Sequence, residues 1–409
     1  NIKEFNSEDD VIKHMYKWYS YNINNNFSKR IVDIYLDYYN LAFQRKPEFM
    51  GFNQVEPTRI INKSAFNHFK YGDEAGSRLK LYEYLAKTVD SLYKKVPEYR
   101  KDAFYQLVYY PVIASYLMNK KFIYYEKSLI YTSHYRKSIN DYSFNSKLAY
   151  DSIKIITDIY NENINNGKWN FIMSMNPRNL PVFDPLPLSN WSIDYSCGWG
   201  ISVEGNKEIK STKCSFGYLK LPTFNLNLNQ KYFIDIFLIN DDSLNWKAEV
   251  SEKWIILNKY QGILSNKSNN KKEDRIYVSI NKNLYASGTK GYITIKDQNS
   301  SYRIEVAVNN TEYSCNNCFI EDDGIISIYA ENYNKLENNG KYKWKILKYL
   351  GYSGASIQSS YEQIFDNNKE NIPSFVEYDL FSTSSGKATI YFYTLPVHPI
   401  NSDFSLRFS

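Results

Sequence analysis

The sequence lacks a hydrophobic run that crosses a membrane, and it lacks the common catalytic motifs. No stretch of about 18 apolar residues occurs, so we expect no membrane-spanning helix. None of the four histidines has HExxH-type spacing, which argues against a metalloprotease-like centre. No GxSxG elbow or phosphate loop is present. We therefore predict neither serine-based acyl transfer nor nucleotide binding, and no cofactor.

Positive charge is also sparse. The net charge of +6 is spread over 409 residues, and the densest basic stretch, NKSNNKKEDR (266–275), contains acids as well. A nucleic-acid-binding face usually shows a concentrated basic patch or stripe. We therefore expect no nucleic-acid partner.

Only four cysteines occur: Cys197, Cys214, Cys315 and Cys318. They allow three pairings, and a single C-x-x-C without a second ligand pair is a poor zinc motif. The segment CNNC favours either a small disulfide or free thiols. If the protein is exported, we predict a loop-closing disulfide between Cys197 and Cys214. No initiator methionine or signal peptide is present at Asn1, so we expect the chain to begin inside a longer polypeptide.

Aromatic residues are abundant instead, with 40 tyrosines among 409 residues. Tyrosine fills a core while keeping its hydroxyl accessible to polar partners. The codon bias of an AT-rich genome explains the excess equally well. The length predicts two to three domains, and the hydrophobic content of 43% indicates a globular protein.

The first 166 residues show helical spacing of apolar side chains. One stripe contains Leu81, Leu85 and Val89. We expect a kink near Pro111 and a helix end at Gly167. The predicted helices cover 6–22, 28–46, 73–96, 97–131 and about 141–164, and their short connections indicate a bundle.

The periodicity changes after a proline-rich stretch, NPRNLPVFDPLPLSN. Alternating segments such as KYFIDIFLIN and YRIEVAVNN follow, separated by Asn, Gly and Ser, which is typical of antiparallel sandwiches. We predict an α+β multidomain fold: an N-terminal antiparallel helical bundle followed by antiparallel β-sandwich domains. The predicted boundaries are 1–175 for the bundle, 176–190 for the linker, 191–313 for the first sandwich and 314–409 for the second.

The acidic stretch EDDGIISIYAENYN raises the question of a glycosidase carboxylate pair. Such pairs lie about 5–5.5 Å or 6.5–9.5 Å apart across a sugar. Asp322 and Asp323 are expected in a turn. In the strand predicted to follow, Glu331 shares a face with Tyr329 and Tyr333 and has no acidic partner there. We therefore expect no catalytic pair in this segment.

Several motifs resemble glycoside hydrolase family 115, which comprises xylan α-1,2-glucuronidases. AFQRKPEFM, VPEYRKDAFYQLVYYPVIAS and NNGKWNFIM are similar to its helical region. ISVEGN, LPTF, WKAEVSEKWIILNKYQG and GTKGYITI are similar to the β-sandwich that follows. DDGIISIYAENYN, LGYSGASI and VEYDLFSTSSGKATIYFYTLP resemble the C-terminal module. After GKW, the family's longer polar and aromatic stretch is shortened here.

This resemblance implies a scaffold rather than a complete enzyme. The family's catalytic carboxylates lie on a (β/α)₈ barrel that precedes the bundle, so no catalytic residue is expected in this chain. The second sandwich, which resembles a jelly-roll carbohydrate-binding module, is expected to be incomplete. The resemblance also implies a secreted parent enzyme that removes glucuronic acid or 4-O-methylglucuronic acid from glucuronoxylan, and a bundle that offers a homodimer surface. The alternative is a stand-alone carbohydrate-binding protein.

Three residues are candidates for substrate contact, and two of them have a structural alternative. Arg45 in QRKPE either grips a uronate carboxylate with two N–H groups or pairs with Glu48 at the helix end. Trp169 either stacks on a sugar or anchors a hinge between domains. Arg178 is placed to meet an acid.

Glu331 is the candidate metal ligand. YAENY resembles the first strand of carbohydrate-binding module families 6 and 35, in which a glutamate at this position helps to hold a structural calcium. Calcium requires roughly six to eight oxygen ligands, and one glutamate with carbonyl groups is an incomplete set. The alternative is a glutamate that accepts hydrogen bonds from nearby backbone groups.

Overall fold

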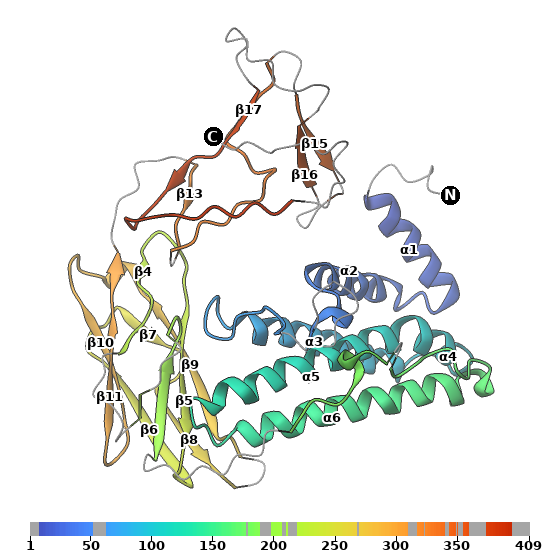
Figure 1. The fold of residues 1–409 in the computed structure, drawn as a ribbon, viewed down its shortest axis with the longest axis horizontal. Helices are drawn as coiled ribbons and strands as arrows, with labels where there is room; N and C mark the ends of the chain where they lie inside the picture. The colour runs from blue at the N-terminus through green and yellow to red at the C-terminus, as the bar shows by residue number, and fades with distance from the viewer. Residues whose placement is uncertain are drawn as a thin grey trace. The chain divides into compact units, whose positions relative to one another are not determined.

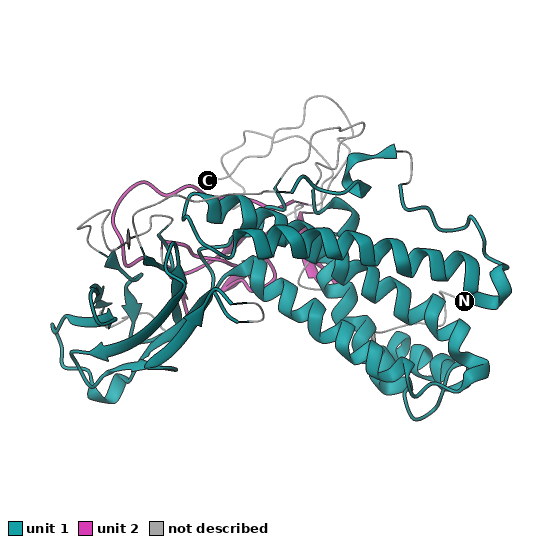
Figure 2. Cartoon of the chain, turned by 90° about the horizontal axis from the view of Figure 1, so that it is seen from below, with its two compact units in different colours: residues 1–310 teal, residues 311–409 magenta. Residues whose placement is uncertain are grey.

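The computed structural model describes residues 8–51, 63–176, 179–188, 198–206, 210–211, 219–267, 270–309, 317–322, 324–339, 343–348, 350, 355–359 and 374–394. The chain forms two compact units, residues 1–310 and 311–409, which Figure 2 colours separately. Helices make up the first part of unit 1, and a mainly antiparallel sandwich follows them, in which β3 pairs parallel with β11. The predicted α+β multidomain class is confirmed.

Six α-helices are described in unit 1, and they occur in the order predicted (Figure 1). They are α1 (Glu8–Asn22), α2 (Ser28–Gln44), α3 (Glu74–Tyr93), α4 (Lys101–Phe104), α5 (Tyr110–Thr132) and α6 (Ile139–Asp158). Short 3₁₀ turns accompany them: η2 (Pro47–Phe49), η3 (Glu98–Arg100), η6 (Ile164–Gly167) and η8 (Pro181–Phe183). Two π-helical turns also occur, η4 (Tyr105–Tyr109) and η5 (Ile159–Asn163). No helix of the described residues is long and apolar enough to span a membrane.

Proline and glycine act in the helical part much as the sequence predicts. The helical run predicted to kink near Pro111 contains the π turn η4, which ends two residues before that proline; the kink itself stays a prediction. A proline ring cannot extend a regular helical hydrogen-bond ladder, and a π turn accommodates this locally. Gly167 ends the last helical run with φ +76°. Leu81 is a correction: it is 54% exposed, while Leu85 and Val89 are buried as predicted.

The sandwich of unit 1 consists of two five-stranded sheets, seen at one end of Figure 1. One has the order β2-β1-β5-β9-β7, and the other β3-β11-β10-β6-β8. The first contains β1 (Trp199–Val203), β2 (Lys210–Ser211), β5 (Tyr232–Leu238), β7 (Ile255–Leu257) and β9 (Glu273–Ile280). The second contains β3 (Leu219–Lys220), β6 (Ser243–Val250), β8 (Gln261–Ser265), β10 (Gly291–Lys296) and β11 (Ser301–Val306). A small pair joins β4 (Phe224–Asn225) to β12 (Val308–Asn309).

The strand β5 differs from the other long strands because all seven of its residues are buried. Alternate residues, including Ile234 and Ile236, enter the core between the two sheets. The residues between them face the opposite side, where Phe233 and Phe237 contact arginine side chains. Strand β10, by contrast, buries only every second residue. A strand buried on both faces indicates that the helices cover the outer face of this sheet.

The described part of unit 2 forms three two-stranded sheets. They join β13 (Phe319–Ile320) to β18 (Leu380–Phe381), β14 (Lys335–Glu337) to β17 (Phe375–Glu377), and β15 (Trp344–Lys348) to β16 (Ala355–Ser359).

The strand predicted through Glu331 is wrong. Asp322 and Ile325 pair across a tight turn, and a second turn brings the N–H of Asn332 to the carbonyl of Tyr329 at 2.9 Å. The second turn lies inside the predicted strand, and β14 begins only at Lys335.

Candidate functional site

A carboxylate lies in the middle of the fully buried strand β5. Asp235 is 4% exposed and interrupts the apolar sequence YFIDIFL. A buried charge is tolerated only when it is paired and hydrogen-bonded. The strand register places Asp235 opposite Arg275 on β9. The Nε and Nη2 groups of Arg275 donate to the two carboxylate oxygens at 2.6 and 3.1 Å, which is the strong two-point geometry.

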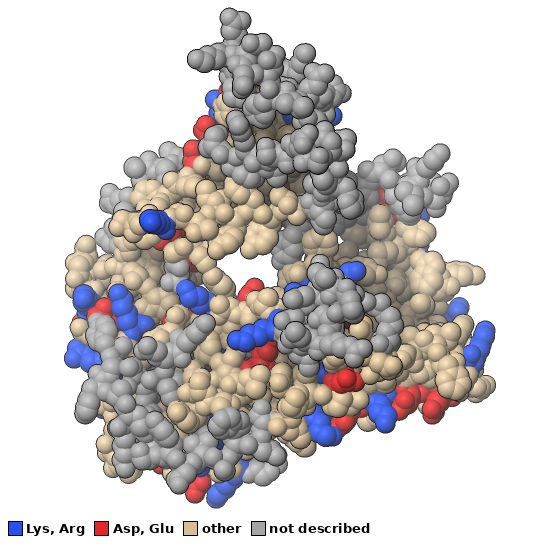
Figure 3. All heavy atoms as spheres, viewed as in Figure 1, with Lys and Arg blue, Asp and Glu red and all other residues tan. Residues whose placement is uncertain are grey.

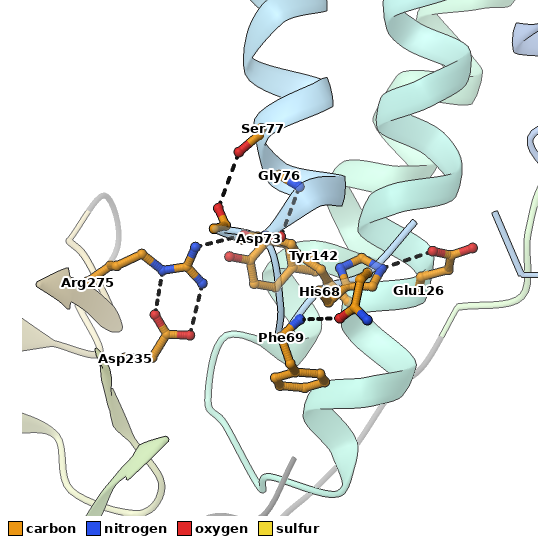
Figure 4. Close-up of polar contacts among 12 residues, drawn as sticks. His68, Phe69, Asp73, Gly76, Ser77, Glu126, Tyr142, Asp235 and Arg275 are labelled. Atoms are coloured by element: carbon orange, nitrogen blue, oxygen red, sulfur yellow. Dashed lines mark hydrogen bonds and ion pairs between the residues drawn. The ribbon is translucent and has the colours of Figure 1, made fainter. Parts of the chain in front are cut away.

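The same arginine reaches the helices (Figure 4). Its Nη1 donates to Oδ2 of Asp73 at 2.8 Å. Asp73 is the N-cap of α3, where its Oδ1 accepts from the N–H of Gly76 at 2.9 Å. Lys127 on α5 donates to Oδ2 of Asp73 at 3.1 Å. One carboxylate therefore caps a helix and ties it both to a second helix and to the sheet.

A second arginine reinforces the contact from the loop between α5 and α6. Arg136 is completely buried, and its Nη1 lies 3.2 Å from both Asp235 and Glu273. Its guanidinium carbon lies 3.8 Å from the ring centre of Tyr131 and 4.2 Å from that of Phe237. A desolvated cation between two aromatic faces gains about 2 kcal/mol or more from each favourable contact.

We call this connected set of charges the ionic joint. It connects the start of α3 and the loop after α5 to the outer face of the first sheet, which is the face away from the sandwich core. Its members are Asp73, Lys127, Arg136, Asp235, Glu273 and Arg275.

The electrostatics keep the ionic joint charged. Burial alone would raise the pKa of Asp235, but Arg275 and Arg136 outweigh it and hold the pKa well below its usual range. Burial would likewise raise the pKa of Asp73, and Lys127 and Arg275 lower it. A general acid needs a raised pKa and access to the substrate. These carboxylates are ionised and only 3–4% exposed, so their arrangement suits a structural connection rather than proton transfer.

Beside the ionic joint lies a group with the residue types of a nucleophilic triad. On α5, Oε2 of Glu126 accepts from the hydroxyl of Ser64 at 2.8 Å and lies 2.9 Å from Nε2 of His68. In a working triad the histidine is hydrogen-bonded to the nucleophile and the acid to the histidine. Here the serine hydroxyl bonds to the carboxylate, so the three residues hold the segment before α3 against α5.

Arg45 is one of the residues singled out from the sequence. It follows α2 in an extended conformation, and its Nε donates to the carbonyl of Phe49 at 2.9 Å. Its own carbonyl accepts from Arg78 at 2.7 Å. Burial lowers the pKa of Arg45, and Glu126 opposes that shift. These contacts close the corner between α2 and η2. The pairing of Arg45 with Glu48 and the binding of a uronate both stay predictions.

Trp169 is half-buried, with the ammonium of Lys168 at 4.9 Å from its ring centre. Arg178, the third candidate for substrate contact, lies outside the described residues, and so do Cys197 and Cys214. Cys318 takes part in a disulfide. The sugar-stacking role of Trp169 and the disulfide between Cys197 and Cys214 therefore remain predictions.

Glu331, the candidate calcium ligand, follows the turn residue Ala330, whose carbonyl accepts from the hydroxyl of Tyr378 at 2.6 Å. In the part of the chain that the structure describes, no group of three or more His, Cys, Asp or Glu side chains is placed to hold a metal ion. The calcium site remains a prediction.

The sequence analysis missed a different acid, Glu321. This side chain is 7% exposed and accepts from the hydroxyls of Ser382 and Ser384 at 2.7 and 2.6 Å. The N–H groups of Thr383 and Ser384 also donate to it, at 2.8 and 3.0 Å. The hydroxyls of Ser384 and then Ser382 contribute most to lowering its pKa to about 2. Glu321 thus fastens β13 to the loop after β18.

The fold and these contacts define a class of protein: a multidomain α+β protein in which helices are joined by buried ion pairs to a sandwich, and whose chain continues into a second β unit. Residues 318–409 match the model of the glycosyl hydrolase family 115 C-terminal domain. For residues 318–409, this match confirms the resemblance to the family's C-terminal module that was seen in the sequence.

Among solved structures, the chain is similar to one described as "a novel family GH115 4-O-methyl-alpha-glucuronidase, BtGH115A, with specificity for decorated arabinogalactans". The sequence identity is 21% and the TM-score 0.40, so no argument rests on this likeness. The match covers 76% of this chain and 43% of that enzyme, and the chain thus spans less than half its length. No curated protein sequence matches the chain.

Proposed function

We propose that this chain is the non-catalytic C-terminal region of a secreted family-115-like α-1,2-glucuronidase. The full-length enzyme would remove glucuronic acid or 4-O-methylglucuronic acid side chains from glucuronoxylan. The match of residues 318–409 to the family's C-terminal domain carries the proposal. Secretion follows from the substrate, because a polymeric xylan is met outside the cell.

The ionic joint supports the scaffolding role. Its carboxylates form ion pairs with arginine and lysine side chains inside unit 1, and each of these partners comes from a different helix, loop or strand. Such a contact fixes the helices against the first sheet, and the buried, ion-paired carboxylates Asp73 and Asp235 are unsuited to protonating a glycosidic oxygen. We infer that unit 1 supplies a rigid base for the catalytic part of the parent enzyme.

The test is an activity assay on the chain by itself. Residues 1–409 are expressed and incubated with glucuronoxylan, and released 4-O-methylglucuronic acid is quantified. We expect no release above a heat-inactivated control. Appreciable turnover would show that a catalytic centre lies within these residues and would overturn the proposal.

A second candidate function, polysaccharide binding by unit 2, is favoured by exposed aromatic side chains. Tyr391 and Tyr393 are 76% and 97% exposed. They lie two residues apart in the segment 387–394, close enough in the chain for both side chains to contact one sugar chain. Among the described residues 198–309 of the first sandwich, by contrast, Tyr260 is the one exposed aromatic residue.

Affinity electrophoresis of residues 1–409 in gels containing glucuronoxylan tests this candidate. Retardation that is lost in Tyr391→Ala/Tyr393→Ala and kept in the control Tyr329→Ala would establish a sugar-binding role. The control side chain is 49% exposed in the same unit. Migration unaffected by the polysaccharide would leave the scaffolding role alone.

A further inference from the structure

The second sheet of the sandwich has an open outer face. Strands β6 and β10 bury every second residue, and the buried side chains, such as Trp246 and Ile293, belong to the core between the two sheets. The residues between them point away from that core and are exposed or half-buried. The first sheet differs, because its strand β5 is buried on both faces. The outer face of the second sheet is therefore a surface of unit 1.

Basic side chains outnumber acidic ones on this surface. The five strands of the second sheet carry four cations and two carboxylates, which are Lys220, Lys247, Lys296 and Arg303, and Glu249 and Glu305. Figure 3 shows basic side chains gathered where Figure 1 places β10, at the edge of the molecule. Uncharged hydrogen-bonding side chains lie on the same strands: Asn245, Gln261, Thr294 and Ser301.

Three of the cations are neighbours across the strands. The register places Lys247 on β6 directly opposite Lys296 on β10, and residues so paired have Cβ atoms about 4.5–5.5 Å apart. Like charges in this position destabilise a sheet. Arg303 on β11 is the diagonal neighbour of Lys296 on its other side. The three cations thus span three strands, a width of about 10 Å.

One carboxylate serves these three cations. Nζ of Lys296 lies 2.5 Å from Oε1 of Glu249. Within the part of the chain that the structure describes, Lys247 and Arg303 have no acid at ion-pair distance. Three exposed lysines of the helical part, by contrast, each pair with an acid one turn away. The sheet face therefore keeps an excess of positive charge that an anion can neutralise.

Arg303 is oriented for such an anion. Its guanidinium carbon lies 3.6 Å from the ring centre of Tyr292, so one flat face of the guanidinium rests on the ring. This stacking leaves the N–H groups at the rim of the guanidinium pointing along its plane. A guanidinium in that orientation binds a carboxylate with two parallel N–H···O bonds, whereas Lys247 supplies a point charge. The pair suits carboxylates that are spaced along one chain.

The uncharged side chains between the cations point to a sugar polymer. Hydroxyl and amide groups such as those of Thr294 and Asn245 both donate and accept, as sugar hydroxyls do. A nucleic-acid face usually shows a more concentrated basic stripe, and here Glu249 lies among the cations. We propose that the outer face of the second sheet binds an acidic polysaccharide by its uronate carboxylates, with Arg303 and Lys247 as the main contacts. The choice of glucuronoxylan as the polymer rests on the proposed function.

The test compares two forms of one polymer. Binding of residues 1–409 to immobilised glucuronoxylan is measured by surface plasmon resonance, beside glucuronoxylan whose uronic acids have been reduced to neutral alcohols. We expect the native polymer to bind at least about fivefold more tightly. Raising the salt from about 50 to 500 mM should remove most of this difference, because salt screens exposed charges.

A matched pair of variants assigns the binding to the sheet. Lys247→Gln/Arg303→Gln should bind native glucuronoxylan about tenfold more weakly. Lys13→Gln/Lys17→Gln, at exposed lysines of α1, changes the net charge equally and should bind as the wild type does. Arg303→Lys keeps the charge without the fork, so its affinity should lie between the two. Circular dichroism shows that each variant is folded.

Four results would overturn the proposal: no binding to native glucuronoxylan, equal binding to the reduced polymer, an unchanged affinity of the folded Lys247→Gln/Arg303→Gln variant, or tighter binding to duplex DNA than to glucuronoxylan. Stacking on Tyr391 and Tyr393 of unit 2 would survive both carboxyl reduction and high salt, so it is distinguished from binding by the sheet. The proposed function has a separate readout. Release of 4-O-methylglucuronic acid by the chain would overturn that function, while the variants still decide whether the sheet binds uronates.

Discussion

Asp235 in unit 1 and Glu321 in unit 2 are both buried carboxylates, but different partners hold them. Asp235 is paired with the guanidinium groups of Arg275 and Arg136. Glu321 is surrounded by uncharged donors, the hydroxyls of Ser382 and Ser384 and neighbouring backbone N–H groups. Both environments lower the pKa of the acid. The two sites differ in what a substitution leaves behind. Loss of an arginine in unit 1 leaves an unpaired buried carboxylate. Loss of the Glu321 carboxylate in unit 2 leaves only a few uncharged donors without an acceptor.

The largest effect is expected for Arg275→Met, because Asp235 and Asp73 would lose a shared cation in a buried site. Breaking a buried ion pair costs about 3–5 kcal/mol. The free energy of unfolding, measured by urea titration of the full chain, should fall by that amount. Arg303→Met is the matched control: Arg303 is exposed on β11 and stacks 3.6 Å from the ring centre of Tyr292. Its loss should cost only about 0.5–1 kcal/mol. Equal losses would contradict the comparison.

Arg136→Lys should have an intermediate effect. The charge remains, but the fork that joins Asp235 to Glu273 and the flat surface between Tyr131 and Phe237 are lost. Lysine does not reproduce such planar contacts. We expect about 2–3 kcal/mol of destabilisation in the same urea titration, less than for Arg275→Met. A loss as large as that of Arg275→Met would show that geometry, and not only charge, governs the ionic joint.

A smaller, pH-dependent effect is expected for Glu321→Gln. The folded pKa of about 2 lies below the ordinary value of 4.5, so the stabilising contribution is fully present above about pH 4.5. It should be lost as the pH falls from about 4.5 towards 2. The glutamine variant should cost about 1–2 kcal/mol at neutral pH and lack this acid dependence. Calorimetry of both proteins between pH 2.5 and 7 measures the difference, and parallel curves would contradict the assignment.

The smallest effect is expected at Lys121, a buried cation held by neutral acceptors. Its Nζ donates to the carbonyls of Val182, at 2.8 Å, and of Asp184. Burial lowers its pKa to about 7, and the charge of Asp184 opposes that shift only in part. Because the unfolded chain binds the proton more tightly, stability should rise from about pH 7 towards 10. Lys121→Met should flatten this rise and change stability at pH 7 by no more than about 1 kcal/mol.

Thermal unfolding of both proteins between pH 6.5 and 9 tests this last prediction. The two proteins differ in one titratable group only, so the difference between the two curves reports on Lys121. A wild-type stability that falls with rising pH would contradict the expected direction.

Periodicity was sufficient to predict the helices and the change to strands, because burial on one face leaves a regular apolar pattern. Leu85 and Val89 are buried as that pattern requires. The failures lie at two places. Leu81 is exposed, and the backbone before Glu331 is taken up by two turns rather than a strand.

One feature of the sequence does predict a buried ion pair in this region. A lone aspartate within the apolar run YFIDIFL must find a cation if the strand is buried, and Asp235 does so. The identity of that cation depends on strand register, and Arg136 comes from a loop about 100 residues earlier in the chain. Neither relation is local, so only the structure gives them. Glu321 depends in the same way on a serine-rich loop some 60 residues later.

The burial of β5 on both faces has a consequence for how this region can be exchanged between proteins. Recombination within the proline-rich stretch would transfer the first sandwich to another protein without the helix ends that cover Asp235 and Phe237. The transferred sandwich would then expose the charged and aromatic side chains on the outer face of its first sheet to solvent. Helices and first sandwich should therefore be inherited together, and the boundary near residue 310 is the natural place for natural or engineered fusions.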